Sequence, residues 1–314
     1  MKILVSGSLA FDRIMDFSGR FKDHILPEKI HVLSVSFMVN RLREKFGGTA
    51  GNIAYSLSLL KETPIILATA GKDFQQYSDW LKKNNIDATY IKLVDDFTAA
   101  AHIFTDLDNN QITGFHPGAM KEASHVSIES IKSEADELFG IVVAGNLEDM
   151  TYYSKEYQRL NIPYIFDPAQ QIPVLTADQL KFAIQGARIF IGNDYEIDLV
   201  LKKTNLTKQD ILKKTELIVT TMGEQGSLIE TKDKSINIPV AKPHEIKDPT
   251  GAGDAYRAGL IKGLLGNYSI EQTGRLAALS AVYPIECYGT QEHSYTSQEF
   301  IRRYKENFNE SIKL

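Results

Sequence analysis

Short apolar runs alternate with longer segments of helical periodicity along this chain, and this alternation constrains the fold more than any other feature. The apolar runs cover residues 3–6, 65–69, 141–144, 164–166, 189–191 and 217–220. Between most of them lie segments with helical spacing, such as residues 52–60, 77–83 and 127–137. Buried strands that alternate with helices predict a mainly parallel sheet covered by helices on both faces.

Several polar or glycine-containing segments directly follow the predicted strands. They are Gly7-Ser8, Asp167-Pro168, Gly192-Asn193 and Thr221-Met222-Gly223. The carboxyl ends of parallel strands meet at one edge of a sheet, where ligands of such folds bind. We therefore expect these segments to lie together at that edge.

Two segments interrupt the alternation because they are strand-like and have no helix between them. Residues 98–105 and 111–116 predict a hairpin around Asp108-Asn109-Asn110. Residues 30–39 predict a further strand, because apolar side chains recur there at a period of two. Those side chains are Leu33, Val35, Phe37 and Val39. Together these segments predict one small antiparallel sheet that lies over the main domain.

The expected division of the chain follows from these two patterns. Residues 1–12, 44–94 and 120–314 form a large α/β domain, and residues 13–43 and 95–119 form the small β-sheet domain. A chain of 314 residues is long enough for one large domain with such an insert.

Composition excludes several classes of function. The formal net charge of −5 argues against a sequence-independent nucleic-acid binder, which needs a basic face, although a small anionic substrate remains compatible with it. The single cysteine, Cys287, permits no intramolecular disulfide, and the seven His form no zinc-type motif. The chain begins directly with a predicted strand instead of a secretory signal, and no run approaches the about 20 apolar residues of a membrane helix. These features predict a cytoplasmic protein.

The run Asp-Pro-Thr-Gly-Ala-Gly-Asp at residues 248–254 precedes a helix-compatible segment. Unpaired backbone N–H groups at the start of a helix favour an anion. Asp254 beside such a site suits a proton acceptor in the transfer of a phosphoryl group to a hydroxyl. The structural alternative is a glycine-rich turn that caps a surface helix. The lysine-bearing P-loop pattern is absent from the sequence, so a phosphate site here would be of another type.

A second group of polar residues lies near the N-terminus. Asp12 follows the first strand, and its two acceptor oxygens suit the two hydroxyls of a vicinal diol. The adjacent glycines Gly47 and Gly48 let the backbone approach a ligand closely, and Asn52 can both donate and accept one turn later. The alternatives are a turn or helix-cap role for Asp12 and close packing of helix against sheet for the glycines.

These motifs, together with Asn-x-x-Glu at residues 193–196 and a glycine-containing loop at residues 217–227, resemble the ribokinase-like (PfkB) family of carbohydrate and nucleoside kinases. The resemblance extends from Gly7 to about Gly289 through four motifs in order. It implies an ATP-dependent kinase of ribokinase-like α/β fold, in which the small sheet is a lid over the substrate. On their own, the Asn-x-x-Glu pattern is also typical of a capped helix start and the loop of a hairpin turn.

The resemblance assigns a role to each candidate residue. Asp254 would be the catalytic base, and the backbone of Gly251, Ala252 and Gly253 would form the anion hole. The acceptor substrate would contact Asp12, Gly47, Gly48 and Asn52. ATP would contact Asn193, Thr221, Gly223 and Gly226, and Glu196 would place Mg²⁺ through water. A monovalent cation such as K⁺, held by backbone carbonyls, is a further expectation.

Three features favour a nucleoside over a free sugar as acceptor. Ala10 stands where ribose and fructose kinases often have Asn, and Phe37, Phe104 and Phe115 on the small sheet could stack on a base. The continuation Asp-Ala-Tyr-Arg-Ala-Gly after residue 253 resembles bacterial and archaeal adenosine or nucleoside kinases.

We therefore expect transfer to the 5′-hydroxyl of a nucleoside, with adenosine as the first candidate. A ribokinase-type or fructokinase-type sugar kinase and a catalytically silent nucleoside-binding protein remain alternatives. Pairing of the small sheet with a second copy would give a homodimer.

Overall fold

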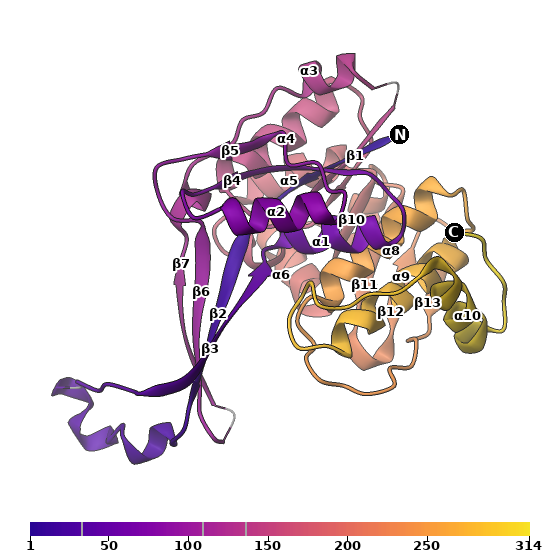
Figure 1. Ribbon diagram of the computed structural model, residues 1–314. Helices are drawn as coiled ribbons and strands as arrows, with labels where there is room; N and C mark the ends of the chain where they lie inside the picture. Colours follow the sequence, from indigo (N-terminus) through magenta and orange to yellow (C-terminus); the bar gives the residue numbers. More distant parts are fainter. Residues whose placement is uncertain (33, 109, 136) are drawn as a thin grey trace.

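The computed structural model describes residues 1–32, 34–108, 110–135 and 137–314. Its main feature is a nine-stranded sheet with the strand order β13-β12-β11-β10-β9-β8-β1-β4-β5 (Figure 1). The strands are β1 (Lys2–Ser6), β4 (Pro64–Ala70), β5 (Ile91–Leu93), β8 (Leu138–Val142), β9 (Tyr164–Phe166), β10 (Ile189–Asn193), β11 (Leu217–Thr221), β12 (Ser227–Glu230) and β13 (Ser235–Ile238). All neighbours from β11 to β5 pair in parallel, whereas β12 and β13 add to the sheet in antiparallel fashion.

Helices cover both faces of this sheet, so the α/β class predicted from the alternation is confirmed. One apolar core joins the sheet to α1 (Thr49–Leu59), α2 (Gln75–Lys83), α8 (Ala252–Leu265), α9 (Ile270–Ile285) and α10 (Ser297–Phe308). The opposite core joins it to α3 (Ile128–Ser133), α4 (Leu147–Arg159), α5 (Ala177–Gly186), α6 (Asp194–Thr204) and α7 (Lys208–Leu212). Because both faces are covered, the central strands are largely apolar, as in β4, where every residue is buried and Thr69 is the one polar side chain.

Polar residues at the helix starts explain where many of these helices begin. Thr176, Thr207, Ser269 and Thr296 each form a reciprocal capping box with the residue three positions later. Such a box satisfies two backbone donors that the first turn of a helix leaves unpaired. The helical spacing predicts a helix over residues 127–137, but helix α3 is shorter and ends at Ser133.

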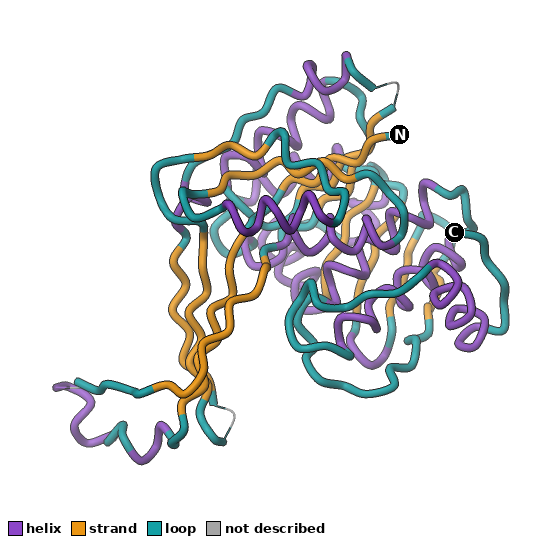
Figure 2. Tube along the Cα trace, in the orientation of Figure 1, coloured by secondary structure: helices purple, strands orange, loops and turns teal. Residues whose placement is uncertain are grey.

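A second, four-stranded sheet with the order β3-β2-β6-β7 projects from the main domain (Figure 2). Its strands are β2 (Ala10–Phe17), β3 (Val39–Gly47), β6 (Ala99–Thr105) and β7 (Gln111–His116). The predicted hairpin is confirmed, since β6 pairs with β7 in antiparallel fashion. The expectation of a wholly antiparallel sheet is wrong, because β2 and β6 pair in parallel. Both strands start at the main domain, where Ala10 lies opposite Ala99, and therefore run outward together.

The strand predicted over residues 30–39 is also wrong. A 3-10 helix occupies Pro27–Val32, and β3 begins only at Val39. The apolar side chain of Phe37 instead packs in a local aromatic cluster, with ring centroids 4.6 Å from Phe17 and 5.2 Å from Phe21. Phe37 therefore packs without a partner strand, whereas Val35 of the same pattern is 40% exposed. Leu33, part of the same prediction, lies outside the described residues.

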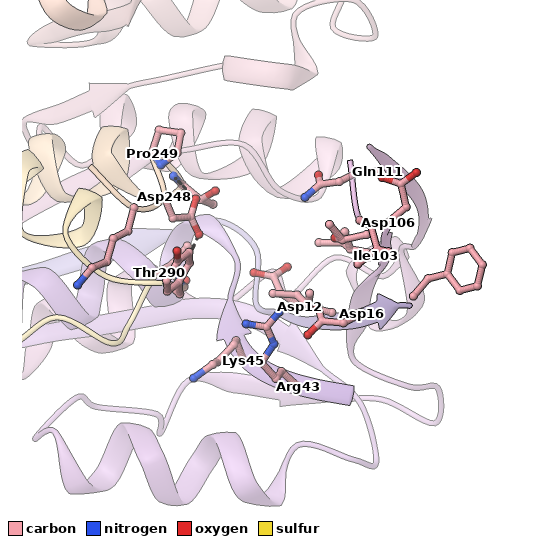
Figure 3. Close-up of a pocket in the computed structure, with 18 residues that line it drawn as sticks. Asp12, Asp16, Arg43, Lys45, Ile103, Asp106, Gln111, Asp248, Pro249 and Thr290 are labelled. Carbon is pink, nitrogen blue, oxygen red and sulfur yellow. Dashed lines mark hydrogen bonds and ion pairs between the residues drawn. The ribbon is translucent and has the colours of Figure 1, made fainter. Parts of the chain in front are cut away.

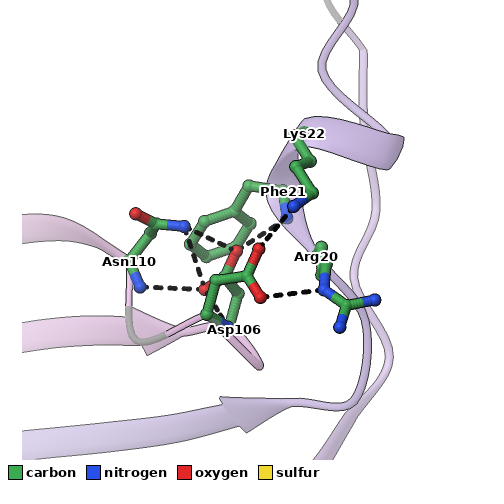
Figure 4. Close-up of polar contacts among 6 residues, drawn as sticks. Arg20, Phe21, Lys22, Asp106 and Asn110 are labelled. Carbon is green, nitrogen blue, oxygen red and sulfur yellow. Dashed lines mark hydrogen bonds and ion pairs between the residues drawn. The ribbon is translucent and has the colours of Figure 1, made fainter.

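Polar contacts hold the outer end of the small sheet to the segment that follows β2 (Figure 4). Asp106 Oδ2 accepts a hydrogen bond from the Phe21 amide at 2.9 Å, and Asp106 Oδ1 accepts one from the Asn110 amide at 2.8 Å. Asp108 pairs with Arg20 and Lys22 at 2.8 and 2.7 Å. The contacts of Asp106 with Phe21 and of Asp108 with Arg20 and Lys22 join two segments that are more than eighty residues apart in the sequence. Within the described part of the chain, no helix is long and apolar enough to cross a membrane.

Candidate active site

A pocket of about 670 Å³ lies between one face of the small sheet and two loops of the main domain (Figure 3). The sheet contributes side chains from β2, β3, β6 and β7, and the loops contribute residues 247–250 and 288–290. The residues of the loop before α8 therefore form the wall opposite the sheet. Asp248, Pro249 and Thr250 of the motif at residues 248–254 line this pocket.

Strand alternation explains which side chains of the sheet enter the pocket. Asp12, Ile14 and Asp16 are spaced two apart on β2 and so point to the same face. Arg43 lies opposite Ile14 in the ladder and Lys45 lies opposite Asp12, which places both cations on that face as well. The pocket thus combines carboxylates, which can accept hydrogen bonds, with cations, which can donate them. Together they could bind a polar, uncharged molecule.

The outer part of the pocket contains an ion pair. Arg43 Nη2 lies 2.7 Å from Asp16 Oδ1, and both side chains line the pocket next to Gln111. All three groups can form directional hydrogen bonds, with Gln111 able both to donate and to accept. The outer end of the pocket therefore carries the side chains best suited to recognise the hydrogen-bonding groups of a ligand.

Asp12 lies at the inner end of the pocket, where its charge is unfavourable. Burial and the nearby Asp248 carboxylate raise the pKa of Asp12 to about 6. A Cβ atom at Gly47 would lie 2.7 Å from Asp12 Oδ2, so a larger residue there would displace the Asp12 carboxylate. Gly48 adopts a φ of +86°, and a Cβ there would lie 2.6 Å from the Ser8 carbonyl oxygen. Backbone geometry thus explains Gly48, and the neighbouring Asp12 carboxylate explains Gly47.

The first turn of α8 supports the predicted anion site. Gly251 precedes the helix with a φ of +82° and makes no side-chain cap hydrogen bond. The Ala252 N–H donates to the Pro249 carbonyl at 3.3 Å. The other backbone N–H groups at this helix start keep capacity for an anion. Thr250, immediately before, lines the pocket. The predicted anion-binding turn is consequently adjacent to the predicted acceptor pocket.

Asp254 follows in the same turn and is held by a residue from α1. Asn52 Nδ2 donates to Asp254 Oδ2 at 2.8 Å. Burial raises the pKa of Asp254 to about 6, while the Arg257 cation and the bond from Asn52 oppose that increase. The structure thus brings together Asn52 and Asp254, which are 202 positions apart in the sequence.

Arg257 is a functional candidate to which sequence reasoning gave no role. Its side chain forms a buried ion pair with Asp167, which follows β9, and Nη1 donates to the Gly253 carbonyl at 2.7 Å. The second oxygen of Asp167, Oδ1, is buried and has no hydrogen-bond partner among the described residues. A charged residue within the apolar run that follows Asp254 was the one available signal in the sequence, since buried charges require partners.

The predicted nucleotide residues lie at the carboxyl ends of β10 and β11. Asn193 and Glu196 form a reciprocal capping box at the start of α6, with both hydrogen bonds at 2.8 Å. Thr221 lies opposite Asn193 in the sheet. Gly223 and Gly226, in the turn before β12, have φ values of +55° and +86°. The structural alternatives of helix cap and turn are therefore correct.

The described residues contain no group of three or more His, Cys, Asp or Glu side chains that could hold a metal ion. Mg²⁺ typically keeps several waters and takes one or two carboxylates from a protein. Glu196, whose pKa is raised by burial, and the unpartnered Oδ1 of Asp167 are the carboxylates that fit such an ion.

The phenylalanines expected to stack on a base do not line the pocket. Phe37 and Phe104 contact each other, with ring centroids 6.4 Å apart, and Phe115 is 53 % exposed. Phe17 lines the pocket instead, because the ladder shifts register between Asp16 and Phe17. Sequence alternation could not reveal this irregularity.

Comparison with known proteins gives consistent results. The profile of the pfkB family carbohydrate kinases matches residues 11–297. The nucleoside kinase of Methanocaldococcus jannaschii is 31% identical over 285 residues, which cover 89% of this chain and 92% of that protein. The nucleoside kinase of Methanothermobacter thermautotrophicus is 30% identical over 96% of this chain and 95% of its own length.

Solved structures show the same similarity. The Burkholderia thailandensis nucleoside kinase in complex with inosine has a TM-score of 0.86 and 36% identity, with 99% of this chain and 100% of that chain covered. The structure of that enzyme in complex with ADP-inosine has a TM-score of 0.84 and 38% identity, with 99% and 97% covered.

Proposed function

The chain belongs to the pfkB family of carbohydrate kinases, and from this membership we propose that it transfers the γ-phosphoryl group of ATP to the 5′-hydroxyl of a nucleoside. One observation carries the proposal above all others. Asp254, held by Asn52, lies in the first turn of a helix without a side-chain cap, and the loop before that helix forms the wall of a pocket that contains Asp12.

The proposed reaction assigns the proton and the two bonds as follows. The Asp254 carboxylate accepts the proton of the 5′-hydroxyl as the 5′-oxygen forms a bond to the γ-phosphorus. The bond between that phosphorus and the β–γ bridging oxygen breaks, and ADP leaves with the electron pair. The backbone N–H groups of Gly251, Ala252 and Gly253 stabilise the negative charge on the transferred group.

The acceptor is positioned by the inner end of the pocket. Asp12 accepts hydrogen bonds from the 2′- and 3′-hydroxyls of the ribose, and Gly47 and Gly48 allow the sugar to approach the backbone. Asn52 uses one N–H for Asp254 and has a second N–H for a substrate hydroxyl. The small sheet acts as a lid over the acceptor, which excludes water as a competing acceptor.

ATP is proposed to bind at the ends of β10 and β11, against Asn193, Thr221, Gly223 and Gly226. Glu196, through water, and Asp167 would hold Mg²⁺, which when bound neutralises charge on the β- and γ-phosphoryl oxygens. Arg257 places a cation one helical turn from Gly253 and so supports the same negative charge. A K⁺ ion held by backbone carbonyls beside α8 belongs to the same proposal.

Adenosine is the first candidate acceptor, and inosine, which the Burkholderia enzyme binds, is the second. The outer end of the pocket is compatible with either base. Asp16 can accept from a 6-amino group, Arg43 can donate to a 6-oxo group, and Gln111 can do both.

A coupled assay of ADP release with Mg·ATP tests the proposal against a panel of nucleosides and free sugars. Turnover of adenosine or inosine is the expected result, with ribose and fructose at least tenfold poorer in kcat/KM. Turnover of sugars alone would identify a sugar kinase. Nucleoside binding without ADP release would identify a catalytically silent binding protein. Replacement of K⁺ by tetramethylammonium in the same assay tests whether the reaction requires a monovalent cation.

We also propose a homodimer formed through the outward face of the small sheet. Met15, Leu42, Phe104 and Ile112 lie in register across its strands, and Leu42 and Ile112 are 64% and 42% exposed. An exposed apolar stripe of this kind is typical of an interface. Sedimentation equilibrium should give twice the chain mass, and L42K/I112K should give the monomer mass. A monomeric parent would contradict the dimer.

A further inference from the structure

A buried hydrogen-bond network extends from α2 to the proposed catalytic base. Trp80 on α2 donates its indole N–H to Gln291 Oε1 at 2.9 Å. Gln291 Nε2 donates to Asn52 Oδ1 at 3.0 Å and lies 2.6 Å from the Tyr77 hydroxyl. Asn52 then donates to Asp254. Gln291 belongs to the loop between α9 and α10, so four separate parts of the fold meet in this network.

The direction of every bond in this network is fixed by Trp80. An indole N–H can only donate, so the Gln291 oxygen must face Trp80 and the Gln291 NH₂ must face Tyr77 and Asn52. Asn52 then accepts through its oxygen, and its NH₂ group points toward Asp254. The Tyr77 hydroxyl accepts from Gln291 and uses its own proton for the Gly47 carbonyl at 2.8 Å. The side-chain amide orientations, which are often ambiguous, follow here from the network.

Packing holds the network in place. Gln291 is 2 % exposed and Tyr77 is fully buried. A Cβ atom at Gly51 would lie 1.9 Å from the Tyr77 hydroxyl oxygen and 3.0 Å from Gln291 Nε2, so α1 needs glycine there. The Trp80 ring stacks on Phe46 and Tyr55 with centroid distances of 5.5 and 5.7 Å. Neither Trp80 nor Gln291 lines the pocket, so neither is placed to contact the acceptor.

We propose that Gln291, anchored by Trp80, is a positioning residue that locks the Asn52 side chain with an N–H directed at Asp254. This inference rests on the proposed function, because it assigns Asp254 the role of base. Without the lock, Asn52 can rotate and present its oxygen to the carboxylate, which would remove a hydrogen bond and add a repulsive contact.

The predicted consequence is a change in the pH dependence of catalysis. The charged groups that act on Asp254 are Arg257 on the same helix, which lowers the pKa of Asp254, and Asp167 after β9, which raises it. Tyr77 on α2 stays neutral because burial raises its pKa. The bond from Asn52 lowers the pKa of Asp254 against the effect of burial. Loss of that bond therefore raises the pKa of Asp254, and a larger fraction of the base is protonated at neutral pH.

Two variants separate this role from simple structural support. Gln291→Met keeps the length of the side chain and removes both hydrogen-bonding groups. Trp80→Phe keeps an aromatic ring and removes the N–H that sets the direction. In both, the acidic limb of kcat against pH should move upward by about one pH unit, with activity recovering toward that of the parent above pH 8.5. Gln158→Met is the matched control, because Gln158 also donates to a buried Tyr hydroxyl, that of Tyr164 at 3.0 Å, far from the site.

A second measurement does not depend on turnover. Trp80 is the single tryptophan of the chain, so its indole N–H gives one resonance in a ¹H–¹⁵N spectrum. That resonance should shift in Gln291→Met and stay in place in Gln158→Met, and ¹³C titration of Asp254 should give a higher pKa in Gln291→Met and Trp80→Phe. A loss of kcat that is equal at every pH, or an unchanged Asp254 titration with a shifted indole signal, would overturn the inference. Absence of turnover in the parent would instead contradict the proposed function while leaving the Asp254 titration as the test of the network.

Discussion

At the scale of single residues, the proposed chemistry depends on carboxylates whose surroundings oppose their charge. Asp12 and Asp254 both have pKa values raised to about 6, with burial as the largest cause. A base is most effective when its pKa lies near the working pH and below it. The two carboxylates are therefore available as acceptors at neutral pH and lose that capacity in mild acid.

Asp254→Asn tests the assignment of the base. The substitution keeps the shape of the side chain and an oxygen that can accept from Asn52, but removes the group that takes the proton. We expect kcat to fall by about 10²–10⁴-fold, with the dissociation constant for nucleoside within threefold of the parent, as measured by calorimetry. Asp233→Asn, in the exposed turn between β12 and β13, is the control. Retention of kcat within tenfold of the parent would remove Asp254 from the role.

Asp12→Asn tests how much the buried charge of Asp12 in the acceptor site lowers the stability of the fold. The folded protein holds the Asp12 proton up to about pH 6, whereas the unfolded chain releases it near 3.8, so stability falls as pH rises through that interval. The neutral variant avoids this loss. We expect its Tm at pH 7 to exceed that of the parent by roughly 3 °C, the shift that about 2 kcal/mol gives at an unfolding entropy of about 2.1 cal/mol/K per residue.

The same variant should lose nucleoside affinity, because the diol loses a charged acceptor. The gain in Tm should disappear at pH 4, where the parent carboxyl is protonated as well. Thermal scans at pH 4 and pH 7 make the comparison. An equal gain at both pH values would show that the charge of Asp12 is not its cause.

At the scale of elements, the buried pair of Arg257 and Asp167 ties α8 to the end of β9. Both side chains are less than 10% exposed, and Arg257 also holds the Gly253 carbonyl. Arg257→Met leaves the Asp167 carboxylate buried and unpaired, so we expect a loss of about 3–5 kcal/mol in the free energy of unfolding. Urea denaturation at pH 7 measures this loss.

The double variant Arg257→Met/Asp167→Leu separates stability from catalysis. Its stability should return to within about 1–2 kcal/mol of the parent, because no unpaired charge remains. Its kcat should stay low, because it lacks both Arg257, proposed to support the negative charge of the transferred group, and Asp167, proposed to hold Mg²⁺. Recovery of kcat together with stability would limit this pair to a structural role.

The junction of β3 and α1 gives a second prediction at this scale. Gly48→Ala places a Cβ 2.6 Å from a backbone oxygen at a φ of +86°. We expect a loss of more than about 1 kcal/mol in the free energy of unfolding and weaker nucleoside binding, because the junction would have to shift beside Asp12. Gly114→Ala in β7, where no atom lies within 4 Å of the new Cβ, should have little effect. Equal stability of the two variants in urea would contradict this explanation.

At the scale of the whole molecule, the small sheet extends away from the main domain and approaches it closely only near its inner end (Figure 1). The pocket spans the space between that sheet and the loops of the main domain. A nucleoside in the pocket would contact both the small sheet and the loops of the main domain. We expect hydrogen–deuterium exchange in residues 10–17, 39–47 and 99–105 to slow by at least fivefold when nucleoside binds.

An ATP analogue alone should leave exchange in these residues unchanged, because its proposed site lies at the ends of β10 and β11. Residues 138–142 in the centre of the main sheet provide an internal reference. Protection confined to the start of α8, with none in the small sheet, would contradict the proposed role of the sheet as a lid.

The sequence by itself determined the class of the main sheet and singled out the candidate site residues along the chain. Periodicity is a local property, so alternating strands and helices could be identified without knowledge of their partners. The rule that parallel strands end at one edge then placed Asn193 near Thr221, and the structure shows them opposite each other. Asp254 could be proposed as the base from the sequence because its glycine-rich neighbours and its position at a helix start are local features.

Only the tertiary structure decided which side chains contact one another. At residues 30–39, Phe37 packs in an aromatic cluster, and the period of two does not correspond to a strand. The partners of Asp254 and Asp167 come from distant parts of the chain, since Asn52 lies on α1 and Arg257 on α8. Gln291 lies in a loop where no local pattern marks it, and its orientation depends on Trp80, 211 positions away. Hydrogen bonds of this range depend on how the helices pack against the sheet, which no local pattern encodes.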